Sequence, residues 1–160
     1  ERANHAVLSG EAARAEALCR EALGREPGAP DIKNNLAHAL SQLGRQEEAV
    51  RLTRELHAAH PDYFFGRIAM ANLHTRAGRV EEAESLLRSL LKLPRLHVTE
   101  FQALCQAQAQ LGRQTGNAER VAQWQTLMEQ GLGQIHRPGG PIATPKVGGY
   151  AGRPLLRFPR

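Results

Sequence analysis

The chain has 160 residues, of which 41% are hydrophobic but only 4% aromatic. This composition favours one domain of Ala- and Leu-packed helices over a sheet, and no apolar run reaches the ~18–20 residues that a membrane-spanning helix needs. Five of the 21 Lys and Arg residues and none of the 16 Asp and Glu residues lie in the last 28 positions, so the net charge of +5 belongs to the C-terminal segment.

Glycines recur along the chain with a constant 34-residue period, at Gly10, Gly44, Gly78 and Gly112. A fixed period of this length is typical of stacked helix–turn–helix units, each of which covers the apolar face of its neighbour. Each glycine is predicted to end the first helix of its unit in the left-handed conformation that side chains disfavour. This divides residues 1–132 into units at 1–27, 31–61, 64–94 and 98–131, the first without the start of its first helix.

Apolar residues stand at fixed distances from these glycines. The residue eight positions before each of the last three glycines is large. The residue seven before each glycine is small, as is the residue five after each of the first three. These positions are Leu36, Met70 and Leu104; Ala3, Ala37, Ala71 and Cys105; and Ala15, Ala49 and Ala83. Large side chains fill a core, and small ones let the two helices of a unit pack closely.

The pattern Leu36-Ala37, Gly44, Ala49 and Pro61, which recurs in the next unit and ends there at Pro94, resembles the tetratricopeptide repeat family. The resemblance covers about residues 1–131, although Lys33 and Arg67 replace the large aromatic residue usual early in the first helix. It implies an all-α fold, a right-handed superhelical α-solenoid of antiparallel helix pairs. It also implies a non-enzymatic cytoplasmic scaffold for protein–protein interaction. The fourth unit has Asn117 at the alanine position, which indicates that residues 116–131 are a capping helix.

In this family the first helices line a concave groove, and polar side chains recur there in the present sequence. The predicted partner-binding residues are Asn4, Asn34, His38, Phe65, Ile68, Asn72, Arg76, Gln102 and Gln106. Amides donate to and accept from a peptide backbone, and Phe65 with Ile68 would form an apolar wall. The sequence therefore predicts a groove for an extended peptide or a partner helix. The alternative is that these are ordinary solvated helix residues.

The segment 133–160 differs from the rest of the chain, because eleven of its positions are Gly or Pro. It could be a basic linker to a further domain. It could instead fold back onto the helices or into a neighbour's groove through Leu155, Leu156 and Phe158, which would give a homo-oligomer. A nucleic-acid-binding arm is disfavoured, because only five charges are spread among the glycines.

The sequence contains no recognisable constellation for catalysis, a cofactor or a metal ion. His57 and His60 lie three residues apart at a helix end, without a Cys or carboxylate at ligand spacing. Cys19 and Cys105 fall at core positions and are expected to be free thiols, which suits a reducing compartment. The remaining alternative is that residues 1–160 are the docking region of a larger multidomain enzyme, whose catalytic domain lies outside this fragment.

Overall fold

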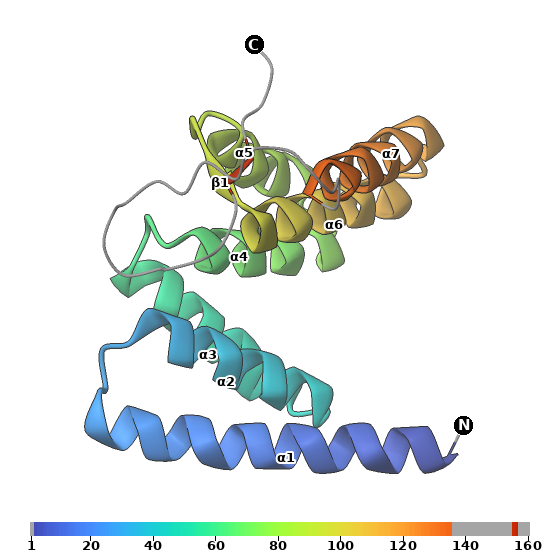
Figure 1. The fold of residues 1–160 in the computed structure, drawn as a ribbon. Coiled ribbons are helices and arrows are strands. Elements are labelled where there is room, and N and C mark those ends of the chain that lie inside the picture. Colours follow the sequence, from blue (N-terminus) through green and yellow to red (C-terminus); the bar gives the residue numbers. More distant parts are fainter. Residues whose placement is uncertain (1, 136–154, 157–160) are drawn as a thin grey trace. The chain divides into compact units, whose positions relative to one another are not determined.

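The computed structural model describes the backbone of residues 2–135 and 155–156 and the side chains of residues 10–131. Seven helices and two short strands make up this part of the chain (Figure 1). They are α1 (Arg2–Arg25), α2 (Pro30–Gln42), α3 (Gln46–Ala59), α4 (Phe64–Arg76), α5 (Val80–Leu90), β1 (Leu96–His97), α6 (Val98–Gln114), α7 (Ala118–Ile135) and β2 (Leu155–Leu156). The predicted all-α fold of helix pairs is confirmed.

The helices fall into two compact units, residues 1–73 and 74–160, with the boundary inside α4. In the first unit α2 packs against both α1 and α3. Its core is formed by Leu36, Leu40 and Ala49, with Cys19 and Leu23 of α1 against them. The apolar residues of α2 thus face both neighbouring helices, as expected for stacked helix pairs.

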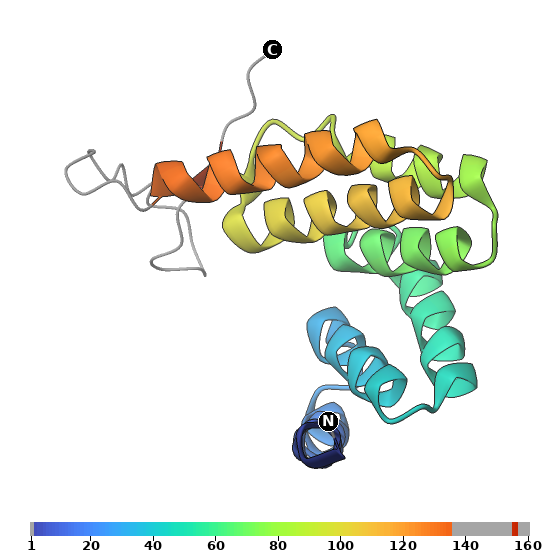
Figure 2. The ribbon, with the colours of Figure 1, turned by 90° about the vertical axis from the view of Figure 1, so that its right-hand side faces the viewer.

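In the second unit α6 is the central helix, packed against α5, α7 and β1. Figure 2 shows α6 and α7 running side by side. Eight residues of α6 are buried, and Leu104 and Leu111 are completely inaccessible to solvent. Most of the small residues predicted to lie inside helix pairs are buried, namely Ala37, Ala49, Ala71, Ala83 and Cys105. Ala15 is half-buried, and the side chain of Ala3 lies outside the described residues.

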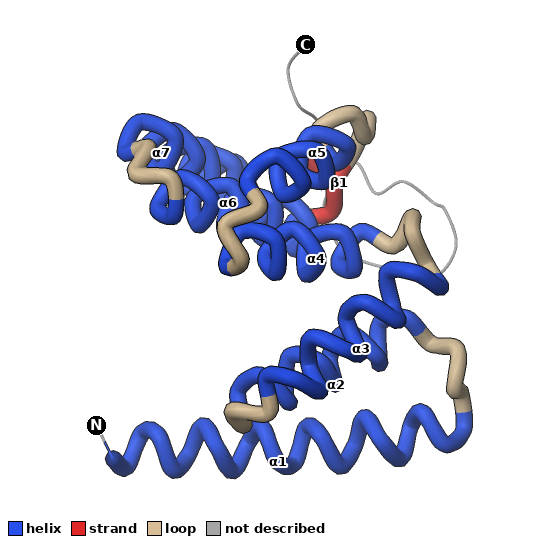
Figure 3. Tube along the Cα trace, turned by 180° about the vertical axis from the view of Figure 1, so that it is seen from behind, coloured by secondary structure: helices blue, strands red, loops and turns tan. Residues whose placement is uncertain are grey.

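The 34-residue period is visible in the helix starts. The first helices α2, α4 and α6 begin at residues 30, 64 and 98. Pro30 provides a helix start because it lacks the N–H that would be unsatisfied there. Acidic residues occupy the first turns of the second helices α3 and α5, where they complement the helix dipole. Short loops join each first helix to the second helix that follows it (Figure 3).

Two of the four glycines were correctly predicted to end a first helix, and two were not. Gly44 and Gly78, each the second residue after α2 and α4, have φ angles of 78° and 71°. Gly10 lies inside α1, which continues from Arg2 to Arg25 without the predicted turn. Its ideal Cβ position has no described atom within 4 Å, and glycine in a helix costs only about 1 kcal/mol relative to alanine.

Gly112 is also helical, because α6 extends to Gln114 and is followed by Gly116 with a φ of 69°. Its lack of a side chain serves packing. A Cβ at Gly112 would stand 2.9 Å from Cγ2 of Val121 and 3.1 Å from the carbonyl oxygen of Asn117. The first helix of the last pair is therefore one turn longer than α2 and α4, and Gly112 allows α7 to approach it.

Residues 155–156 form the strand β2, which pairs antiparallel with β1 so that Leu96 faces Leu156 and His97 faces Leu155. The two-stranded ladder lies at the start of α6 in the second unit. It agrees with the expectation that this segment folds back onto the helices. The predicted anchor Phe158 and most of the segment 133–160 lie outside the described residues.

Candidate functional site

On α2, the predicted partner-binding residues Asn34 and His38 lie one helical turn apart on one face. Asn34 is half-buried and His38 is exposed. The Nε2 atoms of His38 and Gln42 are 3.2 Å apart, which is a hydrogen bond in one tautomer of the histidine. The face of α2 that the sequence assigned to partner binding is thus polar and accessible.

On α4, four predicted residues have different surroundings. Ile68 is only 7% exposed and so offers little surface to a ligand. Phe65 is half-buried, with its ring centroid 5.4 Å from that of Phe64 in an edge-to-face arrangement. Arg76 is exposed. Asn72 is half-buried, and its Oδ1 atom is inaccessible to solvent yet accepts no hydrogen bond from any described residue.

The other predicted residues lie on α6 and α1. On α6, Gln106 is exposed and Gln102, one turn before it, is half-buried. Asn4 was predicted on the first helix of a pair, but it belongs to the uninterrupted α1, and its side chain lies outside the described residues. The predicted residues of α2 and three of the four on α4 belong to the first unit. Arg76, Gln102 and Gln106 belong to the second.

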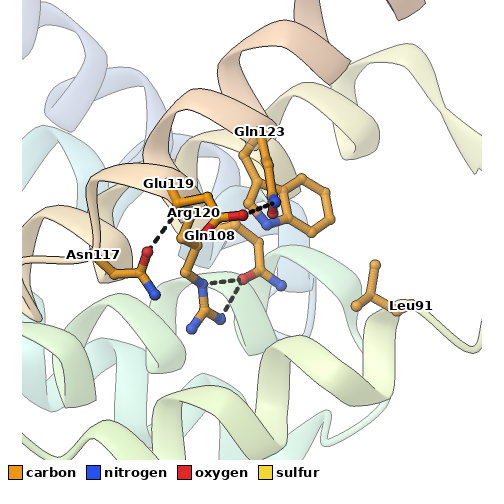
Figure 4. A pocket seen from close by; sticks show the side chains of 7 residues that line it. Leu91, Gln108, Asn117, Glu119, Arg120 and Gln123 are labelled. Atoms are coloured by element: carbon orange, nitrogen blue, oxygen red, sulfur yellow. Dashed lines mark hydrogen bonds between the residues drawn. The ribbon is translucent and has the colours of Figure 1, made fainter.

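Sequence reasoning missed a hollow of about 380 Å³ in the second unit (Figure 4). It is lined by Leu91, Gln108, Asn117, Glu119, Arg120, Gln123 and Trp124. Gln108 of α6 is only 3% exposed. Its Oε1 accepts hydrogen bonds from Nη2 and Nε of Arg120 at 2.6 and 3.2 Å, as Figure 4 shows.

The same guanidinium also donates to Glu84 of α5 at 2.6 Å, so Arg120 joins α5, α6 and α7. Its charge is therefore balanced by Glu84, and the hollow offers hydrogen bonds, the flat Trp124 ring and the exposed carboxylate of Glu119, which accepts a hydrogen bond from Gln123. The sequence contained one signal for this network. Glu84 directly follows the small residue Ala83, just as Glu16 follows Ala15 in α1. Each of these two acids forms an ion pair with an arginine of the next 34-residue repeat, Arg120 and Arg45 respectively.

In the first unit that pairing involves Arg45, which follows Gly44. Arg45 donates to both carboxylate oxygens of Glu48 at 2.6 Å and to Glu16 of α1 at 2.6 Å. Arg20 is a further donor to Glu16 at 2.8 Å. Hydrogen bonds from Arg20 and then Arg45 lower the pKa of Glu16 below its ordinary value. The network holds α1 against the α2–α3 connection and leaves no unpaired carboxylate for acid–base chemistry there.

Both cysteines are free thiols, as predicted, and burial raises the pKa of each. For Cys105, which is 1% exposed, the pKa rises to about 12. A thiol with such a pKa is protonated at neutral pH and is a poor nucleophile. Within the described residues, no cluster of three or more His, Cys, Asp or Glu side chains could hold a metal ion. None of the helices described is long and apolar enough to cross a membrane.

The described chain is thus an all-α protein of consecutive helix pairs, with regularly spaced first helices that are polar on one face. Sequence models of the tetratricopeptide repeat match residues 6–63 and residues 68–98. The chain belongs to the tetratricopeptide repeat family, whose repeats generally mediate protein–protein interaction. No match was found among curated proteins or among solved structures.

Proposed function

We propose that this protein is a non-catalytic scaffold that binds a protein partner along its first helices, as an extended peptide or as a helix. The single observation that carries the proposal is the unsatisfied Oδ1 of Asn72. A buried acceptor without a donor costs about 1–3 kcal/mol. The Asn72 side chain as a whole is half-buried, so a rotation about its last side-chain bond would turn Oδ1 toward a backbone N–H of a bound peptide, and that hydrogen bond would remove the cost.

The other polar side chains predicted on the first helices support a peptide ligand. His38 and Gln106 are exposed, and Asn34 and Gln102 are half-buried, so each can still form hydrogen bonds with a ligand. All four can both donate and accept, which suits main-chain recognition better than recognition of one charge. Arg76 adds one exposed cation at the end of α4.

Peptides selected from a random library displayed on phage, with the full chain as bait, would provide ligands for a quantitative test. The double variant His38→Ala/Asn72→Ala should bind the selected peptides at least fivefold more weakly, since about 1–3 kcal/mol corresponds to a factor of roughly 5–150. Its helical content, measured by circular dichroism, should not change.

The control is Arg54→Ala on α3, an exposed residue outside the predicted face, which should leave peptide affinity unchanged. Asn72→Asp keeps the acceptor oxygen and should bind better than Asn72→Leu, which removes it. Unaltered affinity in the double variant would show that the first helices do not form the binding face.

Two other functions stay as proposals. If residues 1–160 are the docking region of a larger enzyme, the longer coding sequence will contain a catalytic domain with its own motifs. If the chain self-associates through residues 133–160, light scattering will give a mass that falls when this segment is removed. The pairing of β2 with β1 of the same chain gives this segment a place without a second copy.

A further inference from the structure

The strand β1 contacts α6 as well as β2. Leu96 is completely buried in the second unit. His97 has extended dihedral angles, φ −67° and ψ 156°, and its N–H donates to Oε2 of Glu100 at 2.8 Å. This hydrogen bond fixes the start of α6. The backbone of β1 is therefore organised in advance for pairing with another extended segment.

In this structure the pairing segment comes from the same chain. β2 contains only Leu155 and Leu156 and pairs with the two residues of β1 (Figure 1). A ladder of two residues on each side is too short to be stable as a separate unit. It is helped by covalent connection, because a tethered segment competes at an effective concentration that can reach millimolar. Such a strand can be replaced by a better-fitting one.

The charges around β1 fit poorly with the strand that now covers it. Lys92 and Arg95 are exposed immediately before β1. The segment 133–160 carries five Lys and Arg residues and no acid, and Arg157 directly follows Leu156 in the sequence. Glu100, the acidic residue nearest to β1 in the sequence, is engaged by the N–H of His97. Like charges on paired strands are destabilising, and opposite charges stabilise the pair.

We propose that the edge of β1 is an exchangeable strand-binding site for a partner protein, separate from the first helices. The partner supplies an extended segment with apolar residues flanked by Asp or Glu, and it displaces β2. Main-chain hydrogen bonds would provide affinity in this mode of strand addition, and side chains would provide specificity. The acidic flanks would pair with Lys92 and Arg95, and β2 covers the edge when no partner is bound.

The first test measures binding of two fluorescein-labelled peptides to the full chain by anisotropy. One peptide is residues 152–160 (GRPLLRFPR), and the other has every Arg replaced by Glu (GEPLLEFPE). The acidic peptide should bind at least threefold more tightly, and added salt should reduce the difference. In the full chain carrying Leu155→Pro/Leu156→Pro, in which neither residue of β2 has an N–H to donate to β1, both peptides should bind at least threefold more tightly than in the unchanged chain.

A charge reversal at the site sharpens this test. Lys92→Glu/Arg95→Glu should invert the preference, so that the Arg peptide binds more tightly than the Glu peptide. Arg113→Glu, an exposed site at the far end of α6, should leave the preference unchanged. Equal binding of the two peptides, or no binding to either the unchanged or the Leu155→Pro/Leu156→Pro chain, would overturn the proposal.

A disulfide trap identifies the strand that covers β1. His97 and Leu155 face each other in the ladder, so His97→Cys/Leu155→Cys should form a disulfide within one chain when the native thiols are replaced by Ala. An excess of the acidic peptide should slow its formation, while a scrambled peptide should not. A disulfide-linked dimer would instead show that a second copy provides the strand. That result, or a disulfide rate insensitive to the acidic peptide, would contradict the proposal.

Discussion

The close crossing of α6 and α7 predicts that Gly112→Ala destabilises the second unit, although alanine is the better helix former. Alanine in the interior of a helix is favoured over glycine by about 1 kcal/mol. Against this gain, the new Cβ would lie 2.9 Å from Cγ2 of Val121, 3.1 Å from the carbonyl oxygen of Asn117 and 3.2 Å from the nitrogen of Val121.

Two of these three atoms belong to the backbone at the start of α7, so a rotamer change cannot relieve the contact. Forcing an extra methyl group into a packed interface costs about 1–3 kcal/mol. Because α7 itself must shift, we expect the upper end of this range, about 3 kcal/mol. Subtracting the helix-propensity gain leaves a net destabilisation of about 2 kcal/mol.

Denaturation by urea measures this change, followed by the fluorescence of Trp124. It is the single tryptophan of the chain and lies on α7, so its signal reports the second unit. The matched control is Gly10→Ala, a helical glycine on α1 without a described atom within 4 Å of its Cβ position. It should raise the stability of the first unit by up to about 1 kcal/mol, read by circular dichroism.

Adding Val121→Ala removes only the Cγ2 contact, so the double variant Gly112→Ala/Val121→Ala should stay less stable than Val121→Ala alone. If Gly112→Ala instead raises the urea midpoint as Gly10→Ala does, then α6 and α7 do not approach as closely as described. Gly112 would then be a helical glycine without a packing role.

Three further outcomes are expected. Glu16→Gln should lower the urea midpoint of the first unit at pH 7, because the ion pairs of the Glu16 carboxylate stabilise the fold. The difference from the unchanged chain should shrink as pH falls below about 4.3, the ordinary pKa of glutamate, and vanish only below the lowered pKa of Glu16 in the folded state. Arg120→Met should destabilise the second unit by about 1–3 kcal/mol, because Oε1 of buried Gln108 loses its donors, and adding Gln108→Leu should restore part of this loss. The thiol of Cys105 should react with Ellman's reagent at least tenfold more slowly at pH 8 than the other cysteine, with equal rates in denaturant.

The helix pairs could be predicted because they depend on local sequence with a fixed period. The starts of α2, α4 and α6 follow from the 34-residue spacing, and so does the burial of Ala37, Ala71 and Cys105. The positions of the turns could not be predicted equally well. Two glycines, Gly112 and Gly116, could have ended α6. Gly112 was the expected one, because Arg113 follows it just as an arginine follows Gly44 and Gly78. Only the packing of α7 decided between them.

The candidate site was less predictable because solvent access and pairing depend on neighbouring helices. Ile68 had the spacing of a groove residue but is buried. The hollow beside Arg120 was missed because it needs Glu84, Gln108 and Arg120 to meet, and these come from three helices. The unsatisfied Oδ1 of Asn72 is likewise a property of its surroundings and leaves no sign in the sequence.

The additional turn of α6 has a consequence for how such repeats are recognised and engineered. Four inserted residues lengthen a helix by about 6 Å and rotate the following residues by only about 40°. The buried face of the helix is therefore kept, while every later residue loses its place in the 34-residue count. Residues 98–112 still keep the count, whereas α7 begins 38 residues after the start of α5, which itself begins 34 residues after the start of α3. The matches to the family do not extend beyond residue 98. A helix pair can thus keep its packing in three dimensions although it no longer fits a sequence pattern of fixed length. For engineered repeats, we expect that insertions of four residues at the end of a helix are tolerated.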